Sequence, residues 1–288
     1  MKLVRFGKKG NERPGIWIDN EHILDVRSVA FHVKDFNEHF FSNWGLEQLK
    51  ALLTDPCATY ISSKNIRLGP PISRPSKIIC VGANYPAHAK EFGHKIPDEP
   101  ILFSKATTAL IGPTDPIVLP AHSNTVDSEA EIAVVISKRT RNISANEAAN
   151  HIAGYMLMND VTDREAQRKN GQWFLGKGAD TFCPAGPFLV TPDELPPAPQ
   201  IYIQQEFNNI SLQKAQLSDI QFSIPFLIEY ISARITLLPG DVISTGTPPG
   251  IGSARNPQIL MKPNDVVKIT ATGLGFQHNS VTITSSVF

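Results

Sequence analysis

Val126-Asp-Ser-Glu-Ala-Glu-Ile-Ala-Val-Val-Ile136 sets the architecture of this chain, because it starts polar and continues as an unbroken apolar run. A run of this length and composition is typical of a strand that is buried on both faces. Side chains alternate along a strand, so Glu129 and Glu131 point to the same face, about 6.6 Å apart along the strand. Two carboxylates so placed repel each other unless a cation lies between them, which indicates a metal site at the mouth of the strand.

A third acid, Asp160, ends another apolar run, Gly154-Tyr-Met-Leu-Met-Asn159. Three hard oxygen ligands without His or Cys favour Mg²⁺ or Mn²⁺ over Zn²⁺, with Ca²⁺ as a further alternative. The competing interpretation is that Asp127, Glu129 and Glu131 are the wet face of a half-exposed strand, since acidic side chains are mostly exposed. The surrounding motifs favour the metal site.

The composition excludes several classes of protein. Hydrophobic residues make up 41% and charged residues 19% of the 288 residues, so the chain can bury a sizeable core. Lys+Arg and Asp+Glu both number 27, and this net charge of zero argues against nucleic acid or a polybasic membrane contact as a partner. The three cysteines form neither a disulfide framework nor a zinc pattern, and no apolar run suits a signal peptide or a membrane span. We therefore expect a cytoplasmic protein, or one of the mitochondrial matrix if the source is a eukaryote.

Proline content and turn chemistry divide the chain into two parts. Short strands and a helical leucine spacing predict a small N-terminal α+β domain over residues 1–70. The proline-rich segment Asn65–Ser76 is typical of a linker, and residues 71–288 form the second domain. In the second domain we expect mostly strands, a helix over Phe222–Ile235, a helix over Ala145–Ile152 behind a capping box at Ser144–Glu147, and a closing strand at Val266–Thr270.

Two further motifs carry groups suited to catalysis. His88 and Glu91 are spaced i and i+3, so they face each other on a short helix, and a His held by a carboxylate is a competent general base near neutral pH. The alternative is a surface ion pair on a mobile loop. Lys177 lies between Gly176 and Gly178, where the backbone can approach a ligand closely; the alternative is a solvated loop lysine.

Four stretches together resemble the fumarylacetoacetate hydrolase family in order and spacing, from about residue 77 to the end. They are Val81-Gly-Ala-Asn-Tyr85 with His88 and Glu91; Val126-Asp-Ser-Glu-Ala-Glu131; Asn159-Asp-Val-Thr-Asp-Arg164 with Gln167; and Gly176-Lys-Gly-Ala-Asp-Thr-Phe-Cys-Pro184 followed by Thr245-Gly-Thr-Pro-Pro-Gly250. The small N-terminal part also resembles the domain that precedes the catalytic part in many members. The similarity is to the domain-containing branch, which is acylpyruvase-like or oxaloacetate decarboxylase-like, and not to the longer tyrosine-catabolic enzyme.

The resemblance implies a mixed β-sheet roll around a divalent ion, with the small α+β domain before it, usually in homodimers. It implies that Glu129, Glu131 and Asp160 are the metal ligands and that His88 and Glu91 form a base pair on a mobile lid helix. The substrate's oxygens would contact Lys177 and Thr247, and the further substrate-binding residues would be Tyr85, Lys105, Arg164 and Gln167. Ala106 and Ala179 depart from the family pattern at positions expected on the pocket wall, so they bear on the choice of substrate.

The expected chemistry follows from a small 2-oxo acid that chelates one Mg²⁺ through its carboxylate and keto oxygens. Breaking the bond next to that ketone leaves an enolate, whose charge develops where the ion lies. If His88 and Glu91 activate water, the enzyme is a hydrolase of carbon–carbon bonds in ketonic substances, acting on an acylpyruvate-type diketo acid, and this is the function that the sequence favours. Loss of CO₂ would instead make it an oxaloacetate decarboxylase, and movement of a proton alone a keto–enol tautomerase. A non-catalytic metal-dependent binder of oxoacids is the remaining alternative.

Overall fold

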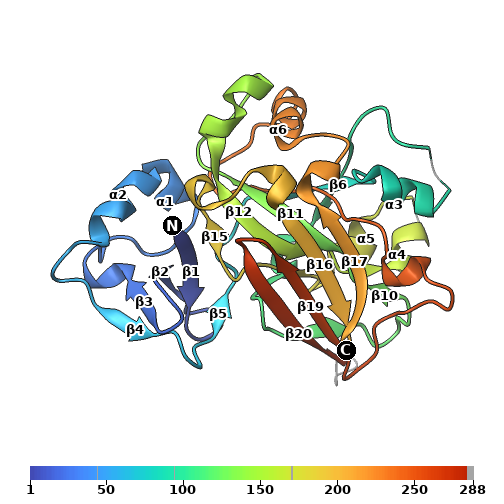
Figure 1. Ribbon diagram of the computed structural model, residues 1–288, viewed down its shortest axis with the longest axis horizontal. Coiled ribbons are helices and arrows are strands. Elements are labelled where there is room, and N and C mark those ends of the chain that lie inside the picture. Colours follow the sequence, from blue (N-terminus) through green and yellow to red (C-terminus); the bar gives the residue numbers. More distant parts are fainter. Residues whose placement is uncertain (44, 94, 170, 284–288) are drawn as a thin grey trace.

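Strands dominate the protein, and its helices are short (Figure 1). The computed structural model describes residues 1–283 apart from 44, 94 and 170. Within these residues one mixed sheet of 11 strands has the order β4-β3-β2-β1-β15-β12-β11-β18-β6-β7, with β5 paired to β1. The bounds of its strands are β1 Lys2–Phe6, β2 Arg13–Trp17, β3 His22–Asp25, β4 Tyr60–Ser62, β5 Leu68–Gly69, β6 Ile78–Gly82, β7 Ile101–Lys105, β11 Ala130–Ile136, β12 Ile152–Asn159, β15 Leu189–Val190 and β18 Val242–Ser244.

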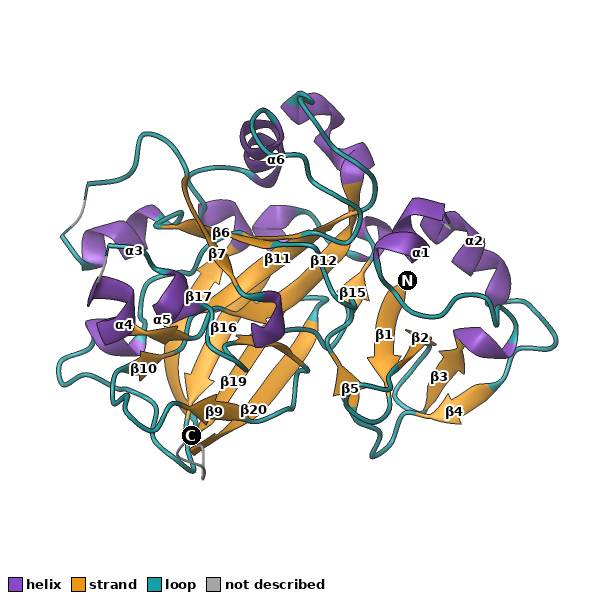
Figure 2. Ribbon diagram, turned by 180° about the vertical axis from the view of Figure 1, so that it is seen from behind, coloured by secondary structure: helices purple, strands orange, loops and turns teal. Residues whose placement is uncertain are grey.

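A second sheet packs against β11 and β12 of the first, and short helices lie around the two (Figure 2). Its order is β17-β16-β19-β20-β9, with bounds β9 Ile117–Leu119, β16 Tyr202–Phe207, β17 Ile210–Gln216, β19 Val266–Ala271 and β20 Gly275–Ile283. Two small pairs are β8 Leu110–Ile111 with β14 Cys183–Pro184, and β10 Val126–Asp127 with β13 Thr162–Asp163. The α-helices are α1 Glu38–Asn43, α2 Gly45–Leu52, α3 Pro86–Glu91, α4 Arg164–Lys169, α5 Phe174–Lys177 and α6 Ile224–Ser232. The 3₁₀ helices are η1 Val26–Ser28, η2 Thr107–Ala109, η3 Ala145–His151, η4 Pro192–Glu194, η5 Ala198–Gln200, η6 Leu217–Asp219 and η7 Gly252–Ala254.

Strand β11 is apolar after Glu131 because this part of it separates two hydrophobic cores. Ile132, Val134 and Ile136 pack into the core shared with the second sheet, and this cluster includes residues of β16 and β19. Ala133 and Val135 point the opposite way, into the cluster that includes α1 and α2. The alternation of a strand thus buries every residue of β11, including Glu131 at its polar end.

The predicted mixed β-sheet fold is confirmed, and the N-terminal part is the expected small α+β unit. Strand β1 pairs with β2 on one side and with β15 of the catalytic part on the other, so the large sheet continues across both parts. The expected linker Asn65–Ser76 contains β5, which pairs with β1. The division near residue 70 therefore stays a prediction, while the hydrogen bonding of the sheet is continuous across it.

Three local predictions need correction. The helix expected over Phe222–Ile235 is the shorter α6, Ile224–Ser232. It begins after the N-cap Ser223, whose side chain accepts from Phe226 N, and Pro225 lies in its first turn. The capping box at Ser144–Glu147 is present, but the helix that it starts is the 3₁₀ helix η3. The strand expected to close the chain, Val266–Thr270, is followed by β20, whose exposed residues alternate with buried ones.

No helix in the described ranges is both long enough and apolar enough to cross a membrane.

Candidate active site

Three buried carboxylates lie together where β11 begins and β12 ends. Ala130 of β11 pairs with Asn159 of β12, and Asp160 N donates to Glu129 O at 2.9 Å, so this register brings Asp160 beside Glu129. Each of Glu129, Glu131 and Asp160 offers an oxygen atom, and these atoms lie within 4.8 Å of one another. All three residues are buried, and so is Asp127, so the interpretation of Asp127, Glu129 and Glu131 as a wet strand face is wrong.

Three cations surround two of these acids. Lys177 Nζ lies 2.8 Å from Glu129 Oε2 and 2.5 Å from Asp160 Oδ2. Lys105 Nζ lies 2.6 Å from Asp160 Oδ1 and also donates to Val161 O. Arg164 Nη2 lies 2.6 Å from Glu129 Oε1. Burial opposes ionisation of Glu129, but Lys177 and Arg164 outweigh it and hold the pKa of this carboxyl well below its ordinary value.

Glu131 has a different environment, because its oxygens meet neutral donors. Ser244 Oγ donates to Glu131 Oε2, and Gly246 N donates to the same oxygen at 3.1 Å. Burial, then the charges of Asp160 and Glu129, raise the pKa of Glu131 to about 8. In the described contacts no lysine or arginine pairs with Glu131, so its ionised form is unbalanced unless a further cation binds. Hard carboxylate oxygens, close spacing and this unpaired carboxyl fit a divalent cation.

Lys177 is the last residue of α5 and is buried, so the alternative of a solvated loop lysine is wrong. Gly176 is required for that position, because a Cβ there would meet the backbone of α4 at 2.5 Å from Gln167 N. Burial would lower the pKa of Lys177, but Asp160 and Glu129 raise it to about 12. The ammonium also lies 4.8 Å from the centre of the Phe103 ring. Lys177 is therefore a fixed positive charge between the acids and the open space beside them.

His88 and Glu91 pair as expected on α3. His88 Nδ1 lies 3.2 Å from Glu91 Oε2, and Glu91 Oε1 accepts from Gly250 N at 2.8 Å. The second contact joins α3 to the loop after β18, so the helix is held over the site. With Nδ1 facing the carboxylate, the other ring nitrogen of His88 is available to take a proton.

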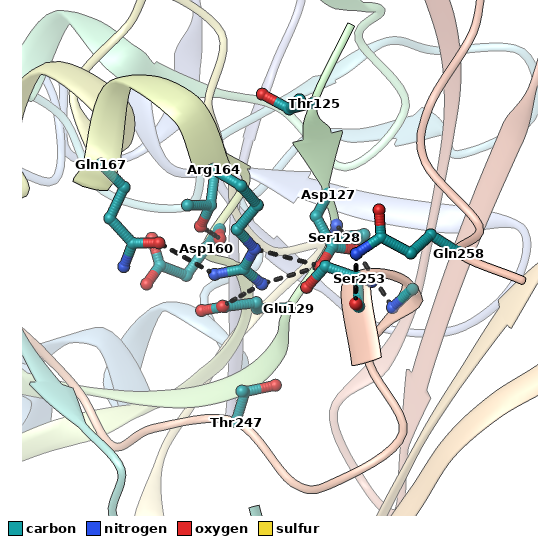
Figure 3. Close-up of polar contacts among 12 residues, drawn as sticks. Thr125, Asp127, Ser128, Glu129, Asp160, Arg164, Gln167, Thr247, Ser253 and Gln258 are labelled. Carbon is teal, nitrogen blue, oxygen red and sulfur yellow. Dashed lines mark hydrogen bonds and ion pairs between the residues drawn. The ribbon is translucent and has the colours of Figure 1, made fainter. Parts of the chain in front are cut away.

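Asp127 fixes the opposite side of the site through Arg164 (Figure 3). Its Oδ2 atom accepts from Arg164 Nη2 at 2.8 Å and Nε at 3.2 Å. The same carboxylate accepts from the backbone N–H groups of Gly252 and Ser253, at 3.1 and 3.0 Å. Burial would lower the pKa of Arg164, but Glu129 and Asp127 outweigh it and raise the pKa above its ordinary value. The sequence interpretation missed this role, since only the position of Asp127 two residues before Glu129 signalled it.

A cavity of about 520 Å³ opens beside the acids. Its lining residues are Val81, Gly82, Ala83, His88, Ala89, Phe92, Phe103, Glu129, Glu131, Arg164, Gln167, Arg168, Trp173, Lys177, Thr247, Ser253 and Gln258. Seven of the predicted site residues are therefore on the wall itself. Glu91 and Asp160 are not in the lining, but each contacts a residue that is: Glu91 contacts His88, and Asp160 accepts a hydrogen bond from Lys177.

Several predicted residues have positions that change their interpretation. Thr247 lines the cavity and its hydroxyl donates to Ala130 O at 3.0 Å. Lys105 and Tyr85 are buried behind the wall, where Lys105 contacts Asp160, and burial together with Glu131 raises the pKa of Tyr85. Ala106 and Ala179 are absent from the described lining, so their expected place on the pocket wall is not supported.

Several wall residues were not indicated by sequence patterns. Among them are Phe103, Trp173, Ser253 and Gln258. Phe103 and Trp173 form an aromatic pair with ring centroids 5.1 Å apart. Ser253 and Gln258 lie in a loop whose residue types carry no recognised motif, so the folded structure was needed to find them.

Comparison with known proteins agrees with this geometry. A family model described as fumarylacetoacetate (FAA) hydrolase C-terminal matches residues 77–282. A 2,4-didehydro-3-deoxy-L-rhamnonate hydrolase of Sphingomonas sp. strain SKA58 is 39% identical over 284 residues, which are 98% of this chain and 96% of that protein. The crystal structure of maleylpyruvate hydrolase from Sphingobium sp. SYK-6, in complex with manganese(II) and pyruvate, is 30% identical with a TM-score of 0.80, over 98% of this chain and 99% of that chain. The structure of 2-hydroxyhepta-2,4-diene-1,7-dioate isomerase from Mycobacterium marinum is 32% identical with a TM-score of 0.77, over 99% and 100%.

Proposed function

This chain belongs to the fumarylacetoacetate hydrolase family, and we propose that it is a divalent-metal-dependent hydrolase that cleaves a carbon–carbon bond in a small acylpyruvate-type diketo acid. One observation carries the proposal: a buried triad of carboxylates, with oxygens within 4.8 Å, shares a cavity with a His–Glu pair. The relatives named rhamnonate hydrolase and maleylpyruvate hydrolase support a hydrolase, whereas the isomerase shows that the fold alone does not fix the reaction.

We propose that Glu129, Glu131 and Asp160 hold Mg²⁺ or Mn²⁺, and the manganese ion in the maleylpyruvate hydrolase structure supports a divalent ion. When bound, such an ion supplies positive charge beside the carboxylate and keto oxygens of a 2-oxo acid, where negative charge develops as the bond breaks. Glu131 is the ligand with most to gain, because burial and the charges of Asp160 and Glu129 raise its pKa to about 8, and no lysine or arginine pairs with it in the described contacts.

His88 is the proposed general base. Glu91 accepts from Nδ1 and orients the ring, so the other ring nitrogen can take a proton from water at the distal carbonyl of the substrate. Water then adds to that carbonyl, the carbon–carbon bond breaks with its electron pair on the pyruvate side, and a returned proton completes pyruvate and a carboxylic acid. Gly250 N fixes the second oxygen of Glu91, which leaves the carboxylate one orientation toward His88.

Lys177 and Thr247 are the proposed contacts to the substrate's oxygens. Lys177 stays protonated at neutral pH because the adjacent acids raise its pKa to about 12. Its ammonium adds a second positive charge beside the oxygen that becomes anionic. Thr247 Oγ1 accepts from Gln213 Nε2 at 2.8 Å and donates its one hydrogen to Ala130 O at 3.0 Å, so its position on the wall is fixed. Donation to a substrate oxygen would replace the hydrogen bond to Ala130 O.

Turnover assays separate this reaction from its alternatives. Magnesium-loaded protein is given acetylpyruvate and, separately, oxaloacetate, and acetate, pyruvate and CO₂ are measured. We expect acetate and pyruvate from acetylpyruvate. Faster release of CO₂ from oxaloacetate would indicate a decarboxylase, and a change in enol absorbance without products a tautomerase. Tight oxalate binding with no product from any diketo acid would refute the hydrolase and indicate a binding protein.

A matched pair of variants tests the base. His88→Asn is expected to lower kcat by about 10²- to 10⁴-fold, the usual contribution of a general base. His22 is a natural control, because its Nδ1 also faces a carboxylate three residues away, Asp19, at 3.0 Å, but on the exposed surface. His22→Asn is expected to keep full activity. Equal activity of the two variants would exclude His88 as the base.

A further inference from the structure

The cavity has a second polar region away from the carboxylate triad. Ser253 and Gln258 line it, on the loop that contains η7, and Gln258 Nε2 donates to Ser253 O at 2.8 Å. Figure 3 shows these two residues on the far side of the Arg164 guanidinium from Gln167. A chain of contacts from Glu129 through Arg164 and Asp127 reaches the Ser253 backbone, so the two regions belong to one wall.

This loop is built rigidly. The Asp127 carboxylate accepts from the backbone N–H groups of Gly252 and Ser253, and Ile259 N donates to Gly252 O at 3.0 Å. A Cβ at Gly252 would lie 1.8 Å from Ile259 O, so only glycine allows the loop to close this tightly. The Ser253 side chain is thus presented from a fixed backbone, as a binding group must be.

The hydroxyl of Ser253 is a buried group without a protein partner. Its Oγ atom makes no hydrogen bond in the described part of the chain, although it is shielded from solvent. A buried hydroxyl left unpaired costs on the order of 1–3 kcal/mol, and buried polar groups in native proteins are nearly always satisfied. A ligand group that hydrogen-bonds there removes this penalty.

The rest of the wall is apolar and aromatic. Phe103 and Trp173 line the cavity together with the apolar residues Val81 and Ala89. Gly82 makes room for Trp173, because a Cβ there would lie 2.9 Å from the Trp173 ring. A ligand in this cavity therefore meets both hydrogen-bonding groups and aromatic side chains. A cavity of about 520 Å³ also has room for more than the four or five carbons of the reacting part.

The charge balance of the cluster favours a neutral tail on the substrate. Among the described residues, four buried carboxylates (Asp127, Glu129, Glu131, Asp160) lie with three buried cations (Lys105, Arg164, Lys177). A divalent ion changes this net charge from −1 to +1 when all are ionised, and one substrate carboxylate then neutralises it. Arg164 already pairs with Asp127 and Glu129, so on the described wall a second substrate carboxylate would face Arg168. Arg168 is exposed and its Nε donates to Arg164 O, so this ion pair would contribute little.

We propose that Ser253 and Gln258 form a subsite for the substrate's tail and that this tail carries hydroxyl groups, as in a dioxo acid derived from a sugar acid. This assignment rests on the proposed function, because it places the tail by assuming that the dioxo end lies at the triad. Ser253 Oγ and the Gln258 amide hydrogen-bond the hydroxyls, while Phe103 and Trp173 contact the C–H face of the chain.

The test compares acylpyruvates of equal length that differ in the tail: vicinal hydroxyls, plain alkyl, or a terminal carboxylate. We expect the highest kcat/KM for the hydroxylated compound. Ser253→Ala and Gln258→Met are expected to lower the ratio of kcat/KM for hydroxylated over alkyl tails by about five- to tenfold each, the size of one hydrogen bond. Ser211→Ala, at an exposed serine of β17, is the matched control and is expected to keep the ratio.

Binding decides the subsite even if nothing is cleaved. Calorimetry on Mn²⁺-loaded protein compares pyruvate with a 2-oxo-3-deoxy sugar acid. A tail that raises affinity in the wild type, and no longer does so in Ser253→Ala and Gln258→Met, supports the subsite. If the tail raises affinity in this way but no substrate is turned over, the proposed hydrolase function is refuted and the subsite is not. A preference for the carboxylate tail, or hydroxyl selectivity unchanged in both variants, would overturn the subsite.

Discussion

Replacing Glu131 by Gln is expected to stabilise the protein when no divalent ion is present and to remove its response to Mg²⁺. Burial, Asp160 and Glu129 raise the pKa of Glu131 from an ordinary 4.5 to about 8. Between these two values the unfolded chain ionises this carboxyl, whereas the folded protein keeps it protonated. The folded state binds the extra proton, so stability falls as the pH rises through this window. The lowered pKa of Glu129 acts below its ordinary 4.5 and does not contribute there.

The size of the effect follows from the same shift. One pKa unit corresponds to about 1.4 kcal/mol, so at about pH 7 the metal-free protein has lost on the order of 3 kcal/mol of stability. Gln is neutral in both states, and its amide oxygen can accept from Ser244 Oγ and Gly246 N as the carboxylate does. Its NH₂ group faces the neighbouring acids. The variant is therefore expected to unfold at a temperature higher by about 5 °C or more.

Thermal unfolding in EDTA and in excess MgCl₂, at about pH 5 and about pH 7.5, measures this directly. In EDTA, the unfolding temperature of the Gln variant should exceed that of the wild type by a large margin at the higher pH and by almost nothing at the lower pH. Mg²⁺ should raise the unfolding temperature of the wild type alone. Glu47→Gln, at an exposed glutamate of α2, is the control and should change neither. A Gln variant that is less stable than the wild type at both pH values, or that gains equally from Mg²⁺, would refute the reasoning.

Other residues give independent predictions. Lys177→Met leaves Glu129 and Asp160 without the cation between them, so metal-free protein should lose about 3–5 kcal/mol of unfolding free energy, recovered in part by Mn²⁺ in chemical denaturation. Asp127→Asn weakens the charge that holds Arg164, and steady-state kinetics should show kcat/KM lowered about tenfold while the fold persists by circular dichroism. Gly252→Ala places a Cβ 1.8 Å from a backbone oxygen, and its urea midpoint should fall by an amount equivalent to more than about 3 kcal/mol.

The apolar run that ends at Ile136 was sufficient to predict a buried strand, because the part of a strand that lies between two cores has no polar position. The alternation of a strand also predicted that Glu129 and Glu131 share a face. The approach of Asp160 depends on the long-range pairing of Ala130 with Asn159. Local pattern indicated it only through the similar setting of Asp160 at the end of an apolar run, and the family resemblance agreed. The predicted homodimer and cytoplasmic location stay predictions.

Other features could not be obtained from local pattern. Lys177 lies on a helix only because Gly176 lets α5 pack closely on α4, and two flanking glycines are equally typical of a loop. Strand β20 was missed because Gly275 and several polar residues occupy much of a strand that is buried at alternate positions. We expected Ala106 and Ala179 to lie on the pocket wall and to bear on the choice of substrate. The cavity is instead lined by Ser253 and Gln258, from a loop distant in sequence. Side chains that meet only through tertiary packing carry no signal in spacing.

Competition between Lys177 and a divalent ion would link metal binding to substrate binding. Lys177 Nζ contacts Glu129 Oε2 and Asp160 Oδ2, while Arg164 and Lys105 hold the other oxygen of each acid. Lys105 is enclosed and also donates to a backbone carbonyl, whereas Lys177 lines the cavity. An ion held by this triad would therefore compete with Lys177 rather than with Lys105. The Lys177 ammonium, released from the acids, would still border the cavity, where it could donate to an oxygen of the proposed substrate.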